Sequence, residues 1–319
     1  MDLKELHYIL HIARCGSLTR AANALYLTQP ALSKFLKNLE QQVGSPLFSR
    51  IGSQLVPTYV GKRYLDYAER MVAMQGDWRA ECADLLGEEK GRLSVAIPLM
   101  RGSCIIPDIL PRFYQKYPQV EVALLEEAHS IEQHLFSSRD IDLVIYNDTS
   151  PSKNLIHEEL GREEIVLVMA KNHALARRGV RRDGCRFPWM DLSLAAGERF
   201  VMHPLEQTTG KLSAQLLGLA GIAPNLLLRT RNSDVAIRLA ANGVALAFAP
   251  ESYIRKIHFE EPPVCFSVGA PKTETTLFAI YQKGRYIPSY TRYFLQLVRD
   301  AMQPASQMDN SPFVPDLKA

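Results

Sequence analysis

Polar and basic side chains recur at helical spacing in a short stretch near the N-terminus. Gln29, Ser33 and Lys37 follow one another at intervals of four residues. Lys34 and Asn38 lie beside them. Such intervals place side chains on one face of a helix. Amide and hydroxyl groups there can hydrogen-bond base edges, and lysines can contact phosphates. An isolated polar helix face is usually only solvated, so the interpretation depends on the surrounding elements.

Two helices joined by a tight turn would hold these residues in place. Ser17 is a suitable N-cap for the first helix, because its hydroxyl can accept a hydrogen bond from a free backbone N–H. Thr28 is expected to cap the second helix, whose first turn accommodates Pro30. Gly44 is expected to end it. The apolar positions that would pack the two helices together are Leu18, Ala21, Ala22, Leu25, Leu32, Phe35, Leu36, Leu39 and Val43. This pattern is typical of a helix-turn-helix that inserts its second helix into the major groove of DNA.

A preceding helix and a β-hairpin would complete this N-terminal module. The apolar positions of the preceding helix are Leu3, Leu6, Ile9, Leu10 and Ala13. Residues 51–59 alternate loosely and predict a hairpin wing. Residues 1–62 contain seven basic and three acidic side chains, a net +4, whereas the whole chain carries only +3. A basic module on a near-neutral body suits a phosphate backbone as partner, although a charge of this size alone does not exclude an ordinary basic surface.

The whole N-terminal segment resembles the winged helix-turn-helix of the LysR-type transcriptional regulators. The matching residues are Ala21-Ala22, Leu25, Thr28-Gln29-Pro30-Ala31-Leu32-Ser33, Leu39-Glu40, Gly44, Leu47-Phe48 and Arg50. The resemblance continues to about Met302. It departs in the wing, where Ser53 replaces a frequent basic residue and Pro57-Thr58 a Leu-Thr pair. The expected DNA-binding residues are Thr28, Gln29, Pro30, Ser33, Lys34, Lys37 and Arg50. Gln29 and Ser33 are expected to reach base edges, and the three cations to reach phosphates.

A long helix is expected after the wing, because no proline interrupts residues 60–87. Its apolar residues Tyr64, Met71, Trp78 and Leu85 fall seven apart, with Tyr67 and Met74 forming a second seam. This heptad spacing favours self-association over packing on its own domain. The resemblance implies the same, a linker helix that pairs two chains. A dimer would present two DNA-binding domains to a DNA site with two-fold symmetry.

The C-terminal body alternates strands and helices, which favours parallel sheets covered by helices on both faces. Predicted strands are 93–97, 120–125, 141–146, 165–170, 200–202, 226–228, 244–249 and 277–281. Predicted helices are 105–117, one between 125 and 141, 212–219, 235–241 and 290–302. The resemblance implies two α/β subdomains like those of a periplasmic solute-binding protein. The chain is expected to cross between them near 161–164 and 269–273.

Loops at the ends of the strands are expected to line a cleft for a small effector. In family terms the effector-binding residues are Met100, Arg101, Gly102, Ser103, His129, Ser130, His203, Thr208, Ser233 and Pro250. Arg101 and the free N–H groups of the helix that follows Pro98 suggest an anionic effector. Met100 stands where the family often has a hydroxyl, which points to a less polar ligand. Taken singly, Arg101, His129 and His203 could equally be ordinary surface or packing residues.

The sequence offers little support for an enzyme. It contains no Gly-x-Ser-x-Gly elbow, no Gly-x-x-x-x-Gly-Lys run and no His-Glu-x-x-His, and its five cysteines lack metal-ligand spacing, so no metal or cofactor is predicted. The adjacent pairs Glu126-Glu127, Glu163-Glu164 and Glu260-Glu261 would point to different sides of an element and are expected to be solvated. Cys104, near a helix start, could be a low-pKa thiol, but no resolving cysteine is evident. An odd cysteine number and the lack of an apolar leader or a ~20-residue apolar span predict a cytoplasmic protein.

The sequence therefore predicts an α+β multi-domain protein. Expected domains are a winged helix-turn-helix (1–62), a linker helix for dimerisation (63–88), an effector domain (91–302) and a flexible tail (303–319). Within the effector domain, subdomain I would comprise 91–162 and 270–302, and subdomain II 163–269. The predicted function is ligand-responsive transcriptional regulation at an interrupted inverted repeat, as a homodimer or the homotetramer implied by the family, with RNA polymerase as a possible partner. Two alternatives stay open: a small-molecule binding protein whose N-terminal helices contact only proteins, and an enzyme using the cleft.

Overall fold

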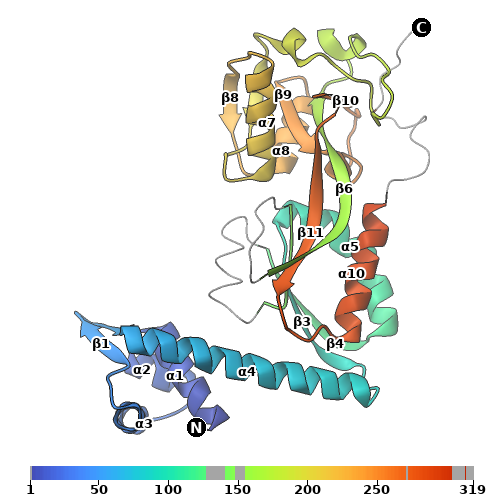
Figure 1. Ribbon diagram of the computed structural model, residues 1–319. Coiled ribbons are helices and arrows are strands. Elements are labelled where there is room, and N and C mark those ends of the chain that lie inside the picture. Colours follow the sequence, from blue (N-terminus) through green and yellow to red (C-terminus); the bar gives the residue numbers. More distant parts are fainter. Residues whose placement is uncertain (1, 127–140, 148–154, 271, 304–312, 314–319) are drawn as a thin grey trace. The chain divides into compact units, whose positions relative to one another are not determined.

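The computed structural model describes residues 2–126, 141–147, 155–270, 272–303 and 313 (Figure 1). The chain divides into two compact units. The N-terminal unit contains residues 1–88 and 285–288, and the regulatory unit contains residues 89–284 and 289–319. In the part of the chain described, no helix is both long and apolar enough to cross a membrane.

The N-terminal unit is a three-helix bundle followed by a hairpin and a long helix. Its elements are α1 (Leu3–Cys15), α2 (Leu18–Ala24), α3 (Gln29–Val43), β1 (Phe48–Ile51), β2 (Gln54–Pro57) and α4 (Tyr59–Leu85). Ser17 caps α2 as predicted, and Gly44 ends α3 in a left-handed conformation, with a φ of 74°. Asp2 and Glu5 form a capping box at the start of α1. The predicted helix-turn-helix is therefore confirmed, and the predicted hairpin is present but begins at Phe48, three residues before its predicted start.

Close packing holds the long helix against the bundle. Leu6, Ile9, Ala21, Leu32 and Leu47 are almost fully buried in the core of this unit. Gly61 lets α4 approach the chain before β1, because a Cβ at Gly61 would lie 1.9 Å from the carbonyl oxygen of Leu47. The start of α4 is thus fixed to the helix-turn-helix.

The regulatory unit contains a nine-stranded mixed sheet, in which eight strands follow the order β4-β3-β5-β11-β6-β9-β7-β8 and β10 pairs with β6. The strands are β3 (Lys90–Ala96), β4 (Gln119–Leu125), β5 (Leu143–Tyr146), β6 (Leu155–Met169), β7 (Arg199–Met202), β8 (Asn225–Arg229), β9 (Leu246–Pro250), β10 (Val264–Ser267) and β11 (Glu274–Gln282). The helices are α5 (Leu99–Lys116), η1 (Ala174–Arg177), η2 (Leu192–Ala195), α7 (Thr208–Leu219), α8 (Ser233–Ala241), α9 (Glu251–Ile254) and α10 (Ser289–Met302).

Two groups of parallel strands are joined by long antiparallel strands. Strand β3 pairs in parallel with β4 and β5, and β7 pairs in parallel with β8 and β9. Strands β6 and β11 run antiparallel beside each other between these groups, as Figure 1 shows. The sequence predicted a strand only from residue 165, but β6 begins at Leu155 and continues through the expected crossing at 161–164. The sheet is consequently mixed rather than parallel.

Two further differences from the sequence predictions concern the ends of elements. Helix α5 begins at Leu99, six residues before its predicted start, so residues 99–103 are helical rather than a loop. In the segment expected to be a flexible tail, the carbonyl of Phe313 accepts a hydrogen bond from the backbone N–H of Cys265 (2.9 Å), and its ring packs on Phe259. The structure therefore contradicts, at Phe313, the prediction of a flexible tail. The helix predicted between residues 125 and 141 lies outside the described residues.

Candidate functional site

The recognition helix α3 buries one face and exposes the other. Leu32, Leu36 and Leu39 are at most 7% exposed and pack into the core of the N-terminal unit. The opposite face carries the predicted DNA-binding residues: Gln29, Pro30, Lys34 and Lys37 are exposed, and Ser33 is half-buried. Thr28 occupies the N-cap position with an extended backbone, but its side chain makes no capping hydrogen bond, contrary to the sequence prediction. The structure thus places these six residues along or directly before one helix.

One carboxylate ties the recognition helix to the wing. Glu40 Oε1, near the end of α3, accepts hydrogen bonds from the backbone N–H groups of Leu47 (2.8 Å) and Phe48 (3.1 Å). Phe48 begins β1, which also carries the exposed Arg50. Backbone pairing of Arg50 with Leu55 of β2 closes the wing. Helix α3 and the wing are therefore held as one body.

The four residues predicted for dimerisation do not share one environment. Met71, Trp78 and Leu85 of α4 are 44%, 61% and 75% exposed. Tyr64 is half-buried and packs against the core of the N-terminal unit, where burial first and the charge of Glu5 second raise its pKa. The exposed apolar stripe consists of Tyr67, Met71, Met74, Trp78 and Leu85.

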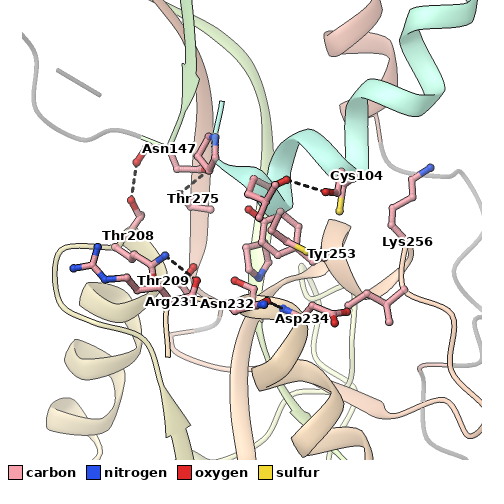
Figure 2. A pocket seen from close by; sticks show the side chains of 18 of the residues that line it. Cys104, Asn147, Thr208, Thr209, Arg231, Asn232, Asp234, Tyr253, Lys256 and Thr275 are labelled. Carbon is pink, nitrogen blue, oxygen red and sulfur yellow. Dashed lines mark hydrogen bonds between the residues drawn. The ribbon is translucent and has the colours of Figure 1, made fainter. Parts of the chain in front are cut away.

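A cavity of about 560 Å³ lies in the regulatory unit, where helices α5, α7 and α8 begin. It is lined by Pro98, Leu99, Met100, Ser103, Cys104, Tyr146, Asn147, Gln207, Thr208, Thr209, Arg231, Asn232, Ser233, Asp234, Arg238, Pro250, Tyr253, Lys256, Ile257, His258 and Thr275. Figure 2 shows Thr208, Thr209 and Arg231 together on one side and Lys256 on the other. Its size and mixed lining suit a small organic molecule.

The predicted effector residues are only partly brought together. Five of them line the cavity: Met100, Ser103, Thr208, Ser233 and Pro250. Arg101, Gly102 and His203 are buried and are not among the lining residues. His129 and Ser130 lie outside the described residues. The cavity also includes residues that the sequence reasoning did not select.

Arg101 is buried behind the cavity instead of lining it, which corrects the sequence expectation. Its side chain is 1% exposed and forms an ion pair with Glu163, which is 2% exposed. It also donates hydrogen bonds to Ser252 Oγ (2.9 Å) and Asn147 Oδ1 (3.1 Å) and stacks over the ring of Tyr253. Desolvation is the largest single influence and disfavours the charge, but the charge and hydrogen bond of Glu163, together with Tyr253 and Cys104, raise the pKa of Arg101 overall. The guanidinium is therefore permanently charged and already neutralised.

Asn147 connects this buried pair to the wall of the cavity. Its Nδ2 donates to Thr275 Oγ1 and to the carbonyl of Thr276, both at 3.3 Å. Its carbonyl accepts a hydrogen bond from Thr208 Oγ1 (2.7 Å) at the start of α7. The side-chain amide of Asn147 thus bonds Arg101 of α5 and two residues of β11, and its backbone carbonyl bonds the start of α7. The end of the predicted strand 141–146 was the sequence signal that could have identified Asn147.

Glu163 and Glu164 point to opposite sides of β6, as predicted, but both are buried rather than solvated. Glu163 accepts hydrogen bonds from Arg101 and Ser252, and Glu164 accepts them from the Ser267 hydroxyl and the backbone N–H of Arg186 (2.9 Å). Adjacent residues on a strand face opposite ways, which explains why each needs its own partners. These carboxylates hold the crossing strand in place.

Two other titratable groups are held neutral by burial. Cys104 lines the cavity, and burial, only partly offset by Arg101, raises the pKa of its thiol to about 11. His203 is 2% exposed, its Nδ1 donates to the carbonyl of Thr230 (2.8 Å), and burial lowers its pKa. A raised thiol pKa is unfavourable for redox reactivity. Within the described residues, no group of three or more His, Cys, Asp or Glu side chains could hold a metal ion.

Comparison with known proteins covers almost the whole chain. The family model described as LysR substrate binding domain matches residues 86–303, and that of the lysR family of bacterial regulatory helix-turn-helix proteins matches residues 3–62. The uncharacterised HTH-type transcriptional regulator YcgK of Bacillus subtilis (strain 168) is 27% identical over 314 residues, 95% of each chain.

Two solved structures share the fold at 19% identity. A full-length OxyR variant from Pseudomonas aeruginosa has a TM-score of 0.68, with 96% of both chains covered. Full-length CbnR complexed with its target DNA has a TM-score of 0.59 and covers 94% of this chain and 100% of its own. At this identity the two structures support the fold alone.

Proposed function

This chain belongs to the LysR family of transcriptional regulators, and from that premise we propose that it reads an interrupted inverted repeat in DNA under the control of a small molecule. Its relatives are regulators, not enzymes. The observation that carries the proposal is the exposed polar face of α3, which Glu40 holds in a fixed position relative to the wing. A reader of chromosomal DNA acts where the chromosome is, which supports a cytoplasmic location.

In this proposal the residues of α3 divide into two roles. Gln29 and Ser33 contact base edges, whereas Lys34, Lys37 and Arg50 contact phosphates. Thr28 and Pro30 set the entry of the helix into the groove. Removing a base-reading group should relax specificity at one position, and removing a phosphate contact should weaken binding to all sequences alike.

The test is selection of binding sites from a random pool of duplexes, followed by fluorescence anisotropy across a salt series. The full chain should enrich a two-fold symmetric site. Gln29→Ala should weaken binding to that site far more than to a scrambled duplex. Lys37→Ala should weaken both and lower the slope of log K against log salt by about one. Lys171→Ala removes an exposed lysine of the regulatory unit and serves as the control. Failure to enrich any sequence would favour a binding protein that does not read DNA.

Dimerisation through α4 is part of the same proposal. Apolar side chains as exposed as Trp78 and Met74 are costly in water, and a second copy of the helix would cover them. Trp78→Glu should shift the mass measured by light scattering toward the monomer, whereas Arg79→Glu, exposed on the same helix, should not. An unchanged mass for Trp78→Glu would reject this interface. The proposal also includes the assembly of two such dimers into a tetramer and a contact between the protein and RNA polymerase.

The effector is proposed to occupy the cavity that Met100, Ser103, Thr208, Ser233 and Pro250 help to line. Because Glu163 neutralises Arg101, an anionic effector would instead require the cations that line the cavity. Each of these has an acidic neighbour: the Nη2–Oε2 distance of Arg231–Glu206 is 4.0 Å, the Nε–Oδ2 distance of Arg238–Asp234 is 2.9 Å, and Lys256 pairs with Asp108. The effector must bind one arrangement of the regulatory units better than another, since equal affinity would shift nothing.

Filling the cavity provides the test of this assignment. A library of metabolites would be screened for compounds that raise the melting temperature of the full chain. Ser103→Trp should abolish the shift caused by any hit, because an indole at this exposed lining position would occupy the cavity. Gln115→Trp, exposed elsewhere on α5, is the control and should preserve the shift. Hits that bind Ser103→Trp unchanged would place the effector elsewhere.

A further inference from the structure

Tyr26 stands out in the turn between α2 and α3 for its backbone conformation. Its φ is +54°, and among the described residues every other positive φ belongs to glycine. A side chain in this left-handed region crowds its own backbone, at a cost that glycine avoids. The turn therefore holds a strained tyrosine where glycine would be easier to accommodate.

The hydrogen bonds of the turn show why the left-handed conformation is required. The N–H of Leu27 donates to the carbonyl of Ala22 (2.9 Å), and the N–H of Tyr26 donates to the carbonyl of Asn23 (3.2 Å). This pair of bonds is the Schellman arrangement, in which the residue after the cap is left-handed. The two other helix ends of the bundle with left-handed caps use Gly16 and Gly44.

The ring of Tyr26 receives no compensation within the N-terminal unit. It is 97% exposed, more than any other large hydrophobic side chain described. Strain that the surrounding contacts do not repay points to a functional role. Burial in the core cannot be that role, so the side chain must act on something outside the chain.

The position of Tyr26 in the chain identifies the partner. It precedes Gln29, the first residue of the recognition helix, by three residues. Successive Cα atoms are about 3.8 Å apart, so the two Cα atoms are separated by at most about 11 Å. The major groove is about 12 Å wide and is bordered by phosphates. When α3 occupies the groove, a long side chain at Tyr26 is within reach of a phosphate, and a phenol can donate a hydrogen bond to it.

We propose that Tyr26 is a DNA-backbone contact, whose hydroxyl donates to a phosphate beside the groove that α3 enters. This inference rests on the proposed reading of DNA by α3. The tyrosine is neutral, so its contact orients the recognition helix without releasing counterions. It differs in this respect from the contacts proposed for Lys34 and Lys37.

The experiment measures anisotropy of Tyr26→Phe and Tyr26→Gly in the full chain, on the selected duplex and on a scrambled one, across a salt series. Tyr26→Phe keeps the ring and removes only the hydroxyl. It should weaken binding roughly 5- to 10-fold on both duplexes. The slope of log K against log salt should stay unchanged, because no charge is removed. Tyr26→Gly should weaken binding at least as much.

The melting temperature of each variant shows whether weaker DNA binding comes from a lost contact with DNA or from a destabilised N-terminal unit. Tyr26→Gly relieves the left-handed strain, so the N-terminal unit should melt a few degrees higher, roughly 4 °C for a unit of this size. Tyr114→Phe, which alters a tyrosine of α5 that is 40% exposed, is the control and should bind DNA normally.

Three results would overturn the inference. Both Tyr26 variants could bind DNA within twofold of the unaltered chain, or the loss could be confined to the selected duplex, which would mean a base contact instead. A Tyr26→Gly variant that melts lower than the unaltered chain would show that the ring stabilises the fold. In each case Gln29→Ala could still lose specificity, so failure here is distinguishable from failure of the proposed function.

Discussion

Breaking the Arg101–Glu163 pair tests the organisation of the regulatory unit most directly. Both side chains are at most 2% exposed, so water cannot solvate a partner left alone. Arg101→Met strands a buried carboxylate, and Glu163→Gln strands a buried guanidinium. Each substitution should lower the free energy of unfolding by about 3 to 5 kcal/mol, the usual cost of breaking a buried pair.

The double variant provides the sharper measurement. It leaves no unpaired charge, and its main loss is the hydrogen bonds that Arg101 and Glu163 form with Asn147 and Ser252. We expect a total cost of about 2 kcal/mol, at roughly 1 kcal/mol for each neutral group left unsatisfied. The double variant should therefore be more stable than either single variant, a strongly non-additive result.

Urea unfolding monitored by tryptophan fluorescence would measure these costs. Trp78 and Trp189 are the two tryptophans of the chain, and only Trp189 belongs to the regulatory unit. A Trp78→Phe background makes the signal specific to that unit. Arg162→Met is the matched control, because Arg162 also forms an ion pair with a glutamate of β6, Glu159 (2.8 Å between Nε and Oε1), but at the surface. Its loss should leave the midpoint unchanged. Additive single costs, or single costs below about 1 kcal/mol, would refute the account of a buried pair.

Three further outcomes are expected elsewhere in the chain. Gly61→Ala should destabilise the N-terminal unit by about 2 kcal/mol or more in thermal unfolding, because the new Cβ would collide with the carbonyl of Leu47. Gly76→Ala on the same helix is the control: its new Cβ meets nothing within 4 Å, so it should stabilise the unit by up to about 1 kcal/mol. Burial lowers the pKa of His203, so the unfolded chain binds the extra proton; stability in urea should fall as pH drops below about 6.5, and less so in His203→Gln. A similar pH dependence in both proteins would contradict this. Because the pKa of Cys104 is about 11, its thiol should react with iodoacetamide at about pH 7.5 roughly 300-fold more slowly than free cysteine. Peptide mass spectrometry would follow the reaction. A rate near that of free cysteine would refute the neutral state of Cys104.

Short sequence patterns were enough to predict the helices and turns of the N-terminal unit. Ser17, Pro30 and Gly44 act through hydrogen bonds and dihedral angles within a few residues of themselves, so their meaning can be inferred from neighbouring letters. Thr28 is the exception there, since its position as a cap was predicted correctly but its hydroxyl hydrogen bond was not found. The alternation of strands and helices was predictable from periodicity, whereas the pair of α/β subdomains was implied by the family resemblance.

The parts of the site that the sequence did not reveal depend on contacts between residues far apart in the chain. The partner of Arg101 is 62 residues away, and no local pattern marks Glu163 as its counter-charge. Residues of the cavity wall such as Tyr253 and Lys256 come from α9, a four-residue helix, and from the segment after it, which are too short to produce a periodic signal. The contacts that each predicted site residue makes with DNA or effector stay predictions.

The pairing of β6 with β11 has a consequence for the order in which the chain folds. Glu164 and Glu274 are opposite each other in the register, and the N–H of Ile165 donates to the carbonyl of Thr273 (2.9 Å). Residues 165–273 therefore form an insertion whose two ends adjoin each other where β6 pairs with β11. The part into which they are inserted needs β11 and α10 for completion, since β5 pairs with β11 and α5 packs on α10. On the ribosome the insertion can fold first, while β3, α5 and β4 must wait, with their apolar faces uncovered, until residue 302 has emerged.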